Sequence, residues 1–446
     1  MTRFDVVAEV PVDAGAARVF EHGWQSWTPT ASYRLAERPH RVLDPNWFVV
    51  NYRGPDHAPP AGFHADGLLA LDPGDGAPVR IWAAADPTTA VAAIRAELHN
   101  GQLRVSADGP VRETVHSGQL SAALGAWAGG YGPGPAEIRP APTIWCSWYH
   151  YFLDVTEADI LENLAGLRAL DLPVDVVQID DGYQAELGDW LTLNNRFDSL
   201  PGLIGRIRAA GRRAGIWVAP YLVGANSAVA RDHPDWLVGS AGGGPVSAGH
   251  HWNQDLYALD PTHPGAAAWL TEVFGTFARI GIDFFKLDFS YAGALPGRRH
   301  EDLPAVAAYR RGLEVIRAAI GPGGYLLGCG APILPSIGLV DAMRVGPDIA
   351  VEYAPRDGDM SAPGQLPAVA NGTARAFQHG RWWVNDPDCL IARPAVERRA
   401  DWAAHVRRYG GLRGSSDRLS ELDSWGLETT RRVLAEVPAP TPFPPD

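Results

Sequence analysis

Two patterns of hydrophobic and polar positions divide the chain. Over residues 1–135, short apolar runs are separated by Gly, Pro and Asp, a pattern typical of short antiparallel strands. Beyond residue 136, strand-like apolar runs alternate with helical patterns, which indicates repeated βα units and a parallel sheet. The change falls at the Gly- and Pro-rich segment 129–135, which predicts a domain boundary there.

The amino-terminal part is predicted to be an antiparallel, β-sandwich-like domain over residues 1–135. An Asn100-Gly101 pair between two apolar runs favours a tight β-hairpin. The predicted strands are 4–10, 41–52, 67–71, 79–85, 90–98 and 102–106.

The second part reads as eight βα units and predicts a (β/α)8 TIM barrel over residues 136–437, so the fold class is α/β. A doubly wound sheet is disfavoured because no Gly-rich phosphate turn follows the first strand. A proline-rich tail over 438–446 is expected to be extended or disordered. The predicted strands are 144–149, 174–179, 215–219, 284–287, 325–328, 342–345, 381–384 and 411–413, and the predicted helices are 156–170 (with Thr156 as N-cap), 203–214, 266–280, 303–320, 366–378, 395–409 and 427–436.

Composition narrows the functional classes. The chain has 446 residues and a net charge of −13, which disfavours binding to nucleic acid or to an anionic membrane. It has no apolar run long enough to cross a bilayer and no evident signal peptide. The three cysteines form no CxxC pair, which favours a reducing, cytoplasmic location. Whether the protein is a monomer or a homo-oligomer stays open.

Polar residues gather where the predicted barrel strands end. The second strand ends in Asp180-Asp181, the fourth in Lys286-Leu287-Asp288 and the sixth in a segment that contains Arg344 and Asp348. In TIM barrels, chemistry occurs at the carboxyl ends of the strands. So many carboxylates on one rim repel one another, and a ligand or a fixed cation is expected to offset that repulsion.

Lys286 stands out because it is the only lysine among the 38 basic residues of the chain. Residues two apart in a strand share a face, so Lys286 and Asp288 are expected to point the same way. A structural ion pair and a functional pair both fit this pattern on its own.

Three chemistries favour a carboxylate-rich rim: a divalent metal site, hydrolysis by a carboxylate pair, and binding of a polyhydroxylated ligand. The histidines form no H-x-x-x-H pair, so neither a metal nor another cofactor is expected. The chain has sixteen tryptophans, several of them near the rim, and aromatic rings pack against the apolar faces of sugars. Carbohydrate is therefore the favoured ligand.

Six motifs in order resemble glycoside hydrolase family 36, the family of the microbial α-galactosidases. They are WCSWYHYF (145–152), QIDDG (178–182), KLDF (286–289), GCGAP (328–332), MRVGPD (343–348) and NDPDCL (385–390). The GWQSW segment (23–27) is similar to the part of the family's amino-terminal domain that lends an aromatic residue to the site. The resemblance covers about residues 140–415, and the sequence departs from it by ending soon after the eighth unit, without the family's usual carboxy-terminal β-domain.

The resemblance implies the roles of individual residues. Asp288 corresponds to the nucleophile and Asp348 to the general acid/base. Asp180 and Asp181 correspond to residues that bind the galactose 4- and 6-hydroxyls. The remaining implied substrate-binding residues are Lys286, Arg344, Trp217, Tyr151, Cys329 and one of Trp24 or Trp27, and which aromatic residue of 148–151 faces the site stays open.

The predicted function is thus the retaining hydrolysis of terminal α-D-galactosyl residues from a small-molecule oligosaccharide or galactoside. Carboxylates about 5–5.5 Å apart favour retention, and about 6.5–9.5 Å favours inversion. Arg344 is expected to face the sugar or another carboxylate rather than Asp348. The segment 224–262 is expected to shape the leaving-group side. An α-N-acetylgalactosaminidase, an α-galactosyl transglycosylase and a non-catalytic carbohydrate-binding protein are the alternatives.

Overall fold

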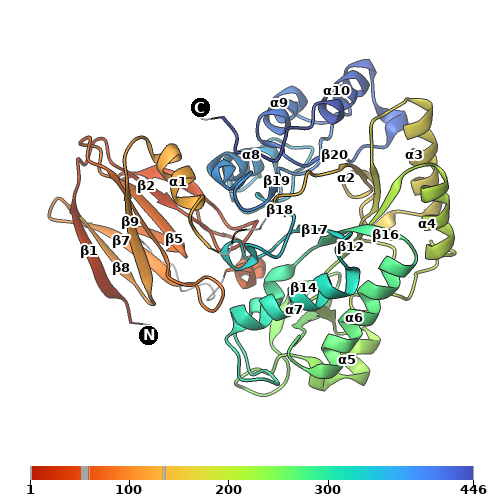
Figure 1. Cartoon of the computed structure of the whole chain (residues 1–446), viewed down its shortest axis with the longest axis horizontal. Coiled ribbons are helices and arrows are strands. Elements are labelled where there is room, and N and C mark those ends of the chain that lie inside the picture. Colours follow the sequence, from red (N-terminus) through yellow and green to blue (C-terminus); the bar gives the residue numbers. More distant parts are fainter. Residues whose placement is uncertain (1–2, 52–58, 60, 133, 135–136, 445–446) are drawn as a thin grey trace.

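The computed structural model describes residues 3–51, 59, 61–132, 134 and 137–444. Figure 1 shows two parts: antiparallel sheets built from the amino-terminal residues on one side, and a barrel of parallel strands with surrounding helices on the other. This arrangement confirms the predicted fold class. The predicted boundary between residues 135 and 136 lies outside the described residues, so the domain limits stay a prediction.

The amino-terminal part consists of two antiparallel sheets. One has the order β1-β8-β7-β4 and the other β3-β2-β5-β6-β9. Their bounds are β1 Asp5–Pro11, β2 Arg18–Glu21, β3 Ala31–Arg34, β4 Phe63–Asp66, β5 Leu68–Asp72, β6 Val79–Ala84, β7 Ala93–His99, β8 Gln102–Ala107 and β9 Val111–His116.

The two sheets pack through a shared apolar core to which Leu71 and Trp82 contribute from one sheet and Ile94 and Val105 from the other. The second face of the five-stranded sheet is buried as well, because α1 (Leu120–Ala128) and barrel residues cover it. Burial on both faces explains why β5 and β6 are almost continuously apolar instead of alternating.

The predicted hairpin is present, with Asn100 and Gly101 both at positive φ between β7 and β8, as a two-residue turn of this type requires. The predicted strand 41–52 is wrong over its described part. Asp44 instead caps the 3₁₀-helix η1 (Pro45–Val50), and Pro45 suits the first helical position. Residue 52 lies outside the described residues. Strands β2, β3, β4 and β9 and helix α1 were not predicted.

The barrel strands follow one another in chain order, and all neighbouring pairs in the sheet are parallel. The sheet closes where β20 pairs with β10, and on its other side Leu390 bridges the last two strands by bonding to Gly414 and Ser416. The strands are β10 Thr143–Cys146, β11 Val176–Ile179, β12 Arg213–Val218, β16 Ile282–Leu287, β17 Tyr325–Gly328, β18 Ala342–Arg344, β19 Val384–Asp386 and β20 Arg413–Ser415.

Helices surround this sheet (Figure 1), and most lie within a few residues of their predicted bounds. Thr156 does cap its helix: its hydroxyl accepts from the Asp159 amide and the Asp159 carboxylate accepts from the Thr156 amide. The helices are α2 Trp148–Tyr151, α3 Glu157–Ala169, α4 Leu200–Ala209, α6 Pro264–Arg279, α7 Ala305–Ile320, α8 Gln365–Ala374, α9 Arg399–Tyr409 and α10 Ser424–Ala435, with 3₁₀ turns η2 Phe152–Asp154, η4 Ser290–Ala294, η5 Leu334–Ser336, η6 Ala376–Gln378 and η7 Leu419–Glu421.

The long segment after β12 forms a small sheet of its own, for which no conformation was predicted. Its order is β13-β15-β14, with β13 Leu222–Gly224, β14 Ser247–His251 and β15 Gln254–Ala258. Helix α5 (Ala228–Asp232) and η3 (Pro234–Trp236) lie between β13 and β14.

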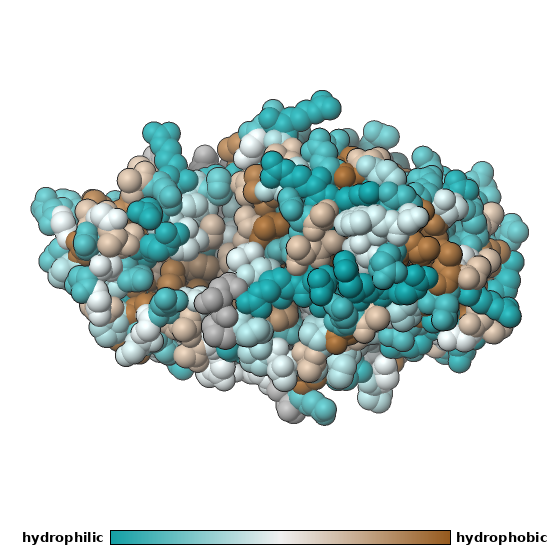
Figure 2. Space-filling model, turned by 90° about the horizontal axis from the view of Figure 1, so that it is seen from above, coloured by the Kyte–Doolittle hydropathy of each residue, from teal (hydrophilic) through white to brown (hydrophobic). Residues whose placement is uncertain are grey.

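The proline-rich tail has no helix or strand over residues 438–444, but it is docked on the barrel. The Phe443 ring stacks on His379 with centroids 3.9 Å apart. In Figure 2, mainly hydrophilic side chains cover the upper face of the molecule, and apolar residues lie between them. None of the helices in the described part of the chain has the length and apolar character needed to cross a membrane.

Candidate active site

A cavity of about 440 Å³ opens at the carboxyl ends of the barrel strands. Its polar wall carries residues from the ends of β11, β12 and β16 and from the loop after β18. Its lining residues include Trp27, Trp47, Val50, Trp148, Tyr149, Phe152, Asp180, Asp181, Trp217, His251, Trp252, Lys286, Asp288, Phe289, Asp348, Ile349, Val351, Glu352, Ser361, Pro363, Ile391 and Arg393.

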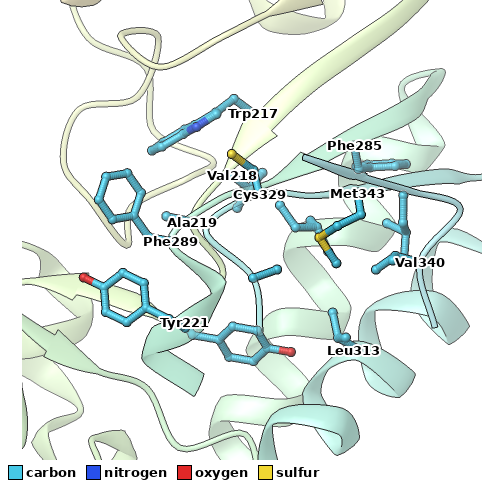
Figure 3. Close-up of a cluster of buried hydrophobic side chains, with 14 of the residues drawn as sticks. Trp217, Val218, Ala219, Tyr221, Phe285, Phe289, Leu313, Cys329, Val340 and Met343 are labelled. Carbon is cyan, nitrogen blue, oxygen red and sulfur yellow. The ribbon is translucent and has the colours of Figure 1, made fainter. Parts of the chain in front are cut away.

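Asp288 follows the last residue of β16 and is held by two donors. Its Oδ1 accepts from the Phe289 amide at 2.8 Å, and its Oδ2 accepts from Trp217 Nε1 at 2.9 Å. Phe289 adopts a left-handed conformation (φ 47°), which turns the chain sharply after the strand. Figure 3 shows Trp217 and Phe289 with the buried side chains that support this end of the barrel. The carboxylate is therefore fixed in position at the cavity wall.

Lys286 lies on the same strand face, as the alternation predicted, but its closest carboxylate is Asp180. Lys286 Nζ is 3.0 Å from Asp180 Oδ2 and 3.8 Å from Asp288 Oδ2. Burial acts to lower the pKa of Lys286, but attraction to Asp180 and Asp288 outweighs burial and raises that pKa well above its ordinary value. Gln178 also donates to Asp180. Lys286 is thus a permanent cation between two carboxylates.

Asp181 is the next residue of this wall. Gln184 donates to one of its oxygens at 2.6 Å and Trp252 Nε1 to the other at 3.0 Å. Burial raises the pKa of Asp181 to about 7, and the neighbouring charge of Asp180 adds to this rise. The turn after Asp181 needs glycine, because Gly182 has φ 114° and a Cβ there would lie 3.0 Å from the Leu153 carbonyl oxygen.

Trp252 reaches Asp181 from the tip of the β14–β15 hairpin. His251 pairs with Gln254, so Trp252 and Asn253 form a two-residue turn with φ of 51° and 56°. A bulky residue at positive φ is uncommon and is often found at a functional site. The segment 224–262 was expected to shape the leaving-group side, but through Trp252 it contacts one of the predicted galactose-binding aspartates.

Arg344 binds three carboxylates at once. Its Nε lies 3.0 Å from Asp386, and its Nη1 lies 3.1 Å from Asp348 and 2.9 Å from Asp388. The expectation that Arg344 would face another carboxylate is met by Asp386 and Asp388, but the expectation that it would not pair with Asp348 is wrong. The guanidinium, whose side chain is 3% exposed, is the fixed cation of this part of the rim.

Asp348 lies at the cavity wall with 32% of its side chain exposed. Desolvation raises its pKa and outweighs the opposing effects of Arg344 and Lys286. Asp388 is fully buried and accepts from the Tyr149 hydroxyl and from the Ile349 amide. Burial raises the pKa of Asp388 to about 7. Two acidic groups with raised pKa values therefore share one arginine.

The amino-terminal part reaches the cavity through Trp27, which packs edge-on against Phe289 with centroids 5.0 Å apart. Gly330 lies under this indole, with φ 50°, and a Cβ there would come within 2.7 Å of it. The turn that carries Trp27 is held by Arg375, a fully buried residue at the end of α8. Arg375 donates to the carbonyls of residues 23, 25, 26, 28 and 345.

Besides Arg344, which meets the cavity only through its contact with Asp348, three of the residues that the resemblance implied do not line the cavity. The Tyr151 hydroxyl instead accepts from Asn163 on α3. Cys329 is fully buried near Asp288 and Lys286, and burial raises its pKa. Trp24, the second residue of the GWQSW turn, has its side chain buried in the core, and its carbonyl accepts from the Ile333 amide. The site roles of these three residues stay predictions.

Other residues reach the cavity without having been named as site residues. They are Trp47 on η1, Trp148 and Tyr149 on α2, and Trp252 and His251 on the hairpin, while Asp388 supports Arg344 from behind. Trp148, Tyr149 and Trp252 belong to the aromatic residues that the sequence placed near the rim. The NDPD motif identified Asp388 as a strand-end carboxylate but not as a partner of Arg344.

The geometry suits acid–base and nucleophilic chemistry on a neutral ligand. One carboxylate is fixed by neutral N–H donors, a second has a raised pKa and partial access to solvent, and a lysine and an arginine offset the negative charge. Within the described ranges, no group of three or more His, Cys, Asp or Glu residues is arranged to hold a metal ion.

Comparisons with known proteins place this fold among related proteins. The sequence model of the Melibiase family matches residues 136–313. The structure of TtGalA, an α-galactosidase from Thermus thermophilus, in complex with stachyose has a TM-score of 0.80 and 30% identity, and the match covers 97% of this chain and 93% of that one. The GH36 α-galactosidase AgaA from Geobacillus stearothermophilus shares the fold, with a TM-score of 0.62 and 15% identity over 96% of this chain and 61% of that one.

Among curated proteins, matches are confined to shorter segments. The α-galactosidase AgaA of Geobacillus stearothermophilus is 33% identical over 113 residues, which is 24% of this chain. The bifunctional α-galactosidase/sucrose kinase AgaSK of Mediterraneibacter gnavus is 34% identical over 113 residues. These matches span 15% and 12% of the respective relatives' own length.

Proposed function

The chain belongs to glycoside hydrolase family 36, and we propose that it is an α-galactosidase that cleaves terminal α-D-galactosyl residues with retention of configuration. The observation that carries the proposal is the pair formed by Asp288 and Asp348 at the wall of one cavity. The relative with the stachyose complex is named an α-galactosidase, and its match extends over nearly all of both chains.

In this proposal Asp288 is the nucleophile. Attack on an anomeric carbon needs an ionised carboxylate held in one orientation, and the donors Phe289 N–H and Trp217 Nε1–H supply that orientation. The Lys286 ammonium at 3.8 Å stabilises the ionised form. The carboxylate then forms a covalent glycosyl-enzyme intermediate, which water hydrolyses in the second step.

Asp348 is the proposed general acid/base. It needs to hold a proton near neutral pH, and desolvation raises its pKa in that direction. It donates this proton to the leaving oxygen in the first step and takes one from the incoming water in the second. Its partial exposure lets water reach it once the leaving group has departed.

The galactosyl ring is proposed to bind at the wall formed by Asp180, Asp181, Lys286 and Trp217. The Lys286 ammonium and the two carboxylates offer donors and acceptors to hydroxyl pairs, and Trp217 Nε1 is committed to Asp288. Asp181 is held by Trp252 and Gln184, so its lone pairs point in fixed directions. Neutral, polyhydroxylated ligands suit this wall better than anions do, because five carboxylates line the cavity.

Cytoplasmic location is part of the same proposal. The three cysteines, Cys146, Cys329 and Cys389, are all buried and unpaired with one another by disulfides, as suits a reducing compartment. A small soluble galactoside is the proposed partner.

The test is a panel of nitrophenyl glycosides with the product anomer followed by NMR. We expect cleavage of the α-D-galactoside with release of α-galactose. Asp288→Asn is expected to lower kcat on every galactoside by at least about 10³-fold, because no covalent step remains. Asp348→Ala is expected to lower kcat/KM by about 10²–10⁴-fold on substrates with poor leaving groups and far less on dinitrophenyl galactosides.

A matched control is Asp283→Asn. Asp283 lies on β16, the strand that Asp288 follows, but its half-exposed side chain pairs with Arg213 and does not line the cavity. This variant is expected to keep the wild-type rate. Wild-type turnover by Asp288→Asn, or release of β-galactose, would overturn the mechanism, and faster cleavage of the N-acetylgalactosaminide would overturn the substrate assignment.

A further inference from the structure

The cavity has a second wall that differs in chemistry from the first. The residues that follow Asp348, namely Ile349 and Val351, line it together with Ile391, Pro363, Trp148 and Phe152. Aliphatic and aromatic side chains thus make up most of this wall, next to Asp348. Trp148 and Phe152 pack edge-on, with ring centroids 5.2 Å apart.

This apolar wall lies on the side of the leaving group. A general acid protonates the leaving oxygen and must lie next to it, so the residues adjoining Asp348 along the chain contact the aglycone, not the galactosyl ring. Ile349 and Val351 follow Asp348 directly, and Ile349 also ties the loop to Asp388 through its amide. This placement rests on the function proposed above.

Two of the three polar side chains on this side are committed to the protein, and the third, Glu352, is exposed to solvent. The Ser361 hydroxyl donates to Asp359 at 2.6 Å, and Arg393 donates to Asp417 and to the Tyr149 carbonyl. A sugar in the leaving-group position would bring several hydroxyls against Ile349, Val351 and their neighbours. Each hydroxyl that lost water without gaining a partner would weaken binding.

Phe152 gives a second, independent observation. It sits between α2 and η2 with φ 48° and ψ −138°, a conformation that non-glycine residues rarely adopt. It is nevertheless a phenylalanine, it lines the cavity, and 49% of it is exposed to solvent. Strained backbone concentrates at ligand-binding sites. A large exposed apolar ring held in this way at the rim indicates contact with an apolar ligand group.

We propose that the leaving-group subsite takes an apolar aglycone, an alkyl or aryl group, in preference to a second sugar. The side chain of Phe152 and the 349–351 segment then determine specificity. Burying one more methylene contributes about 0.8 kcal/mol, which corresponds to about a fourfold gain in kcat/KM per carbon. This gain is expected mainly as a lower KM, because aglycone contacts made equally in the ground and transition states leave kcat unchanged.

The experiment measures kcat/KM of the full chain on methyl, butyl, hexyl and octyl α-D-galactosides and on melibiose and raffinose. We expect a rise of about fourfold per methylene until the wall is covered, and higher kcat/KM on hexyl galactoside than on either sugar. Phe152→Ala is expected to flatten the rise. The control Leu153→Ala, a neighbour that is 40% exposed and does not line the cavity, is expected to keep the wild-type slope.

The outcomes separate this inference from the proposed function. Cleavage of all galactosides with no dependence on chain length, or with preference for melibiose and raffinose, would overturn the apolar subsite and leave the α-galactosidase standing. Failure to cleave any α-galactoside would overturn both. The wild-type series alone decides the question should Phe152→Ala not fold, and a wild-type slope in folded Phe152→Ala would remove Phe152 from the subsite.

Discussion

Asp388→Asn tests how the shared arginine sets the proton affinity of Asp348. One Nη1 atom of Arg344 lies 3.1 Å from Asp348 and 2.9 Å from Asp388, so the two carboxylate oxygens are at most about 6 Å apart. At an effective dielectric constant of about 20, two charges at that distance repel by about 3 kcal/mol, or about two pKa units. The 32% exposure of the Asp348 side chain reduces this effect, so one to two units is about the range to expect.

The sign follows from which form each charge favours. The repulsion from Asp348 that helps to raise the pKa of Asp388 is mutual, so an ionised Asp388 opposes ionisation of Asp348, and it also uses part of the positive charge of Arg344. The asparagine removes both effects, so the pKa of Asp348 falls. The general acid then loses its proton at lower pH, and the alkaline limb of kcat/KM is expected to move down by about one to two units.

The assay is a pH profile of kcat/KM on a methyl or phenyl galactoside, which needs protonation of its leaving group. The same profile on a dinitrophenyl galactoside serves as the control, because its leaving group departs without a proton and its alkaline limb is expected to stay in place. An alkaline limb that is unmoved, or that moves to higher pH, on the methyl galactoside would refute the assigned coupling between Asp388 and Asp348.

Two further outcomes follow from the structure. Burial raises the pKa of Asp181 from 3.8 to about 7, so the folded state binds this proton more tightly than the unfolded state, and stability is lost as pH rises from about 4 to about 7. Asp181→Asn is therefore expected to remove this loss and to unfold at higher urea concentration than wild type at pH 8. Its KM for galactosides is expected to rise. Equal urea midpoints for the two proteins at pH 8 would contradict the stability prediction. Thr156→Ala breaks the capping box of α3 and is expected to cost about 1 kcal/mol of unfolding free energy in urea, whereas Thr156→Ser, which keeps the hydroxyl, is expected to lose little.

The barrel and its rim could be predicted because local and global preferences agree there. Parallel strands buried on both faces are continuous apolar runs, and the first polar residue after each run marks its carboxyl end. Asp180, Lys286 and Asp348 were placed at the rim in this way. The sequence also predicted that Lys286 and Asp288 share a face, since the side-chain period of a strand is two.

Residues outside the regular strands escaped prediction for a physical reason. At Ser147 the chain changes from strand to helix, so the period of two no longer tells which aromatic ring faces inward. Trp148 and Tyr149 line the cavity, while Tyr151 points to α3. Trp252 lies at the tip of a hairpin whose turn has no Gly and only one Asn, so the usual turn signal is weak.

Ion pairs between residues far apart in the sequence were the hardest feature to predict. Arg344 contacts Asp348 four residues away, but it also contacts Asp386 at the end of the next strand and Asp388 just beyond it. No local pattern shows that three carboxylates converge on one guanidinium. Nor does any local pattern show that Lys286 pairs with Asp180, which lies 106 residues away in the sequence. Only the closed barrel brings such groups together.

The hydrogen bonds from Arg375 to the GWQSW turn limit when the native structure can form during synthesis. The turn leaves the ribosome about 350 residues before the arginine that binds its carbonyls, so Trp27 has no fixed position through most of synthesis. Four of the five acceptors of Arg375 are carbonyls of residues 23–28, and without them a buried cation would lack most of its partners. The amino-terminal part and the barrel can therefore form these contacts only after most of the chain has been synthesised. A barrel expressed without the first 30 residues should lose solubility as well as the aromatic wall of its cavity.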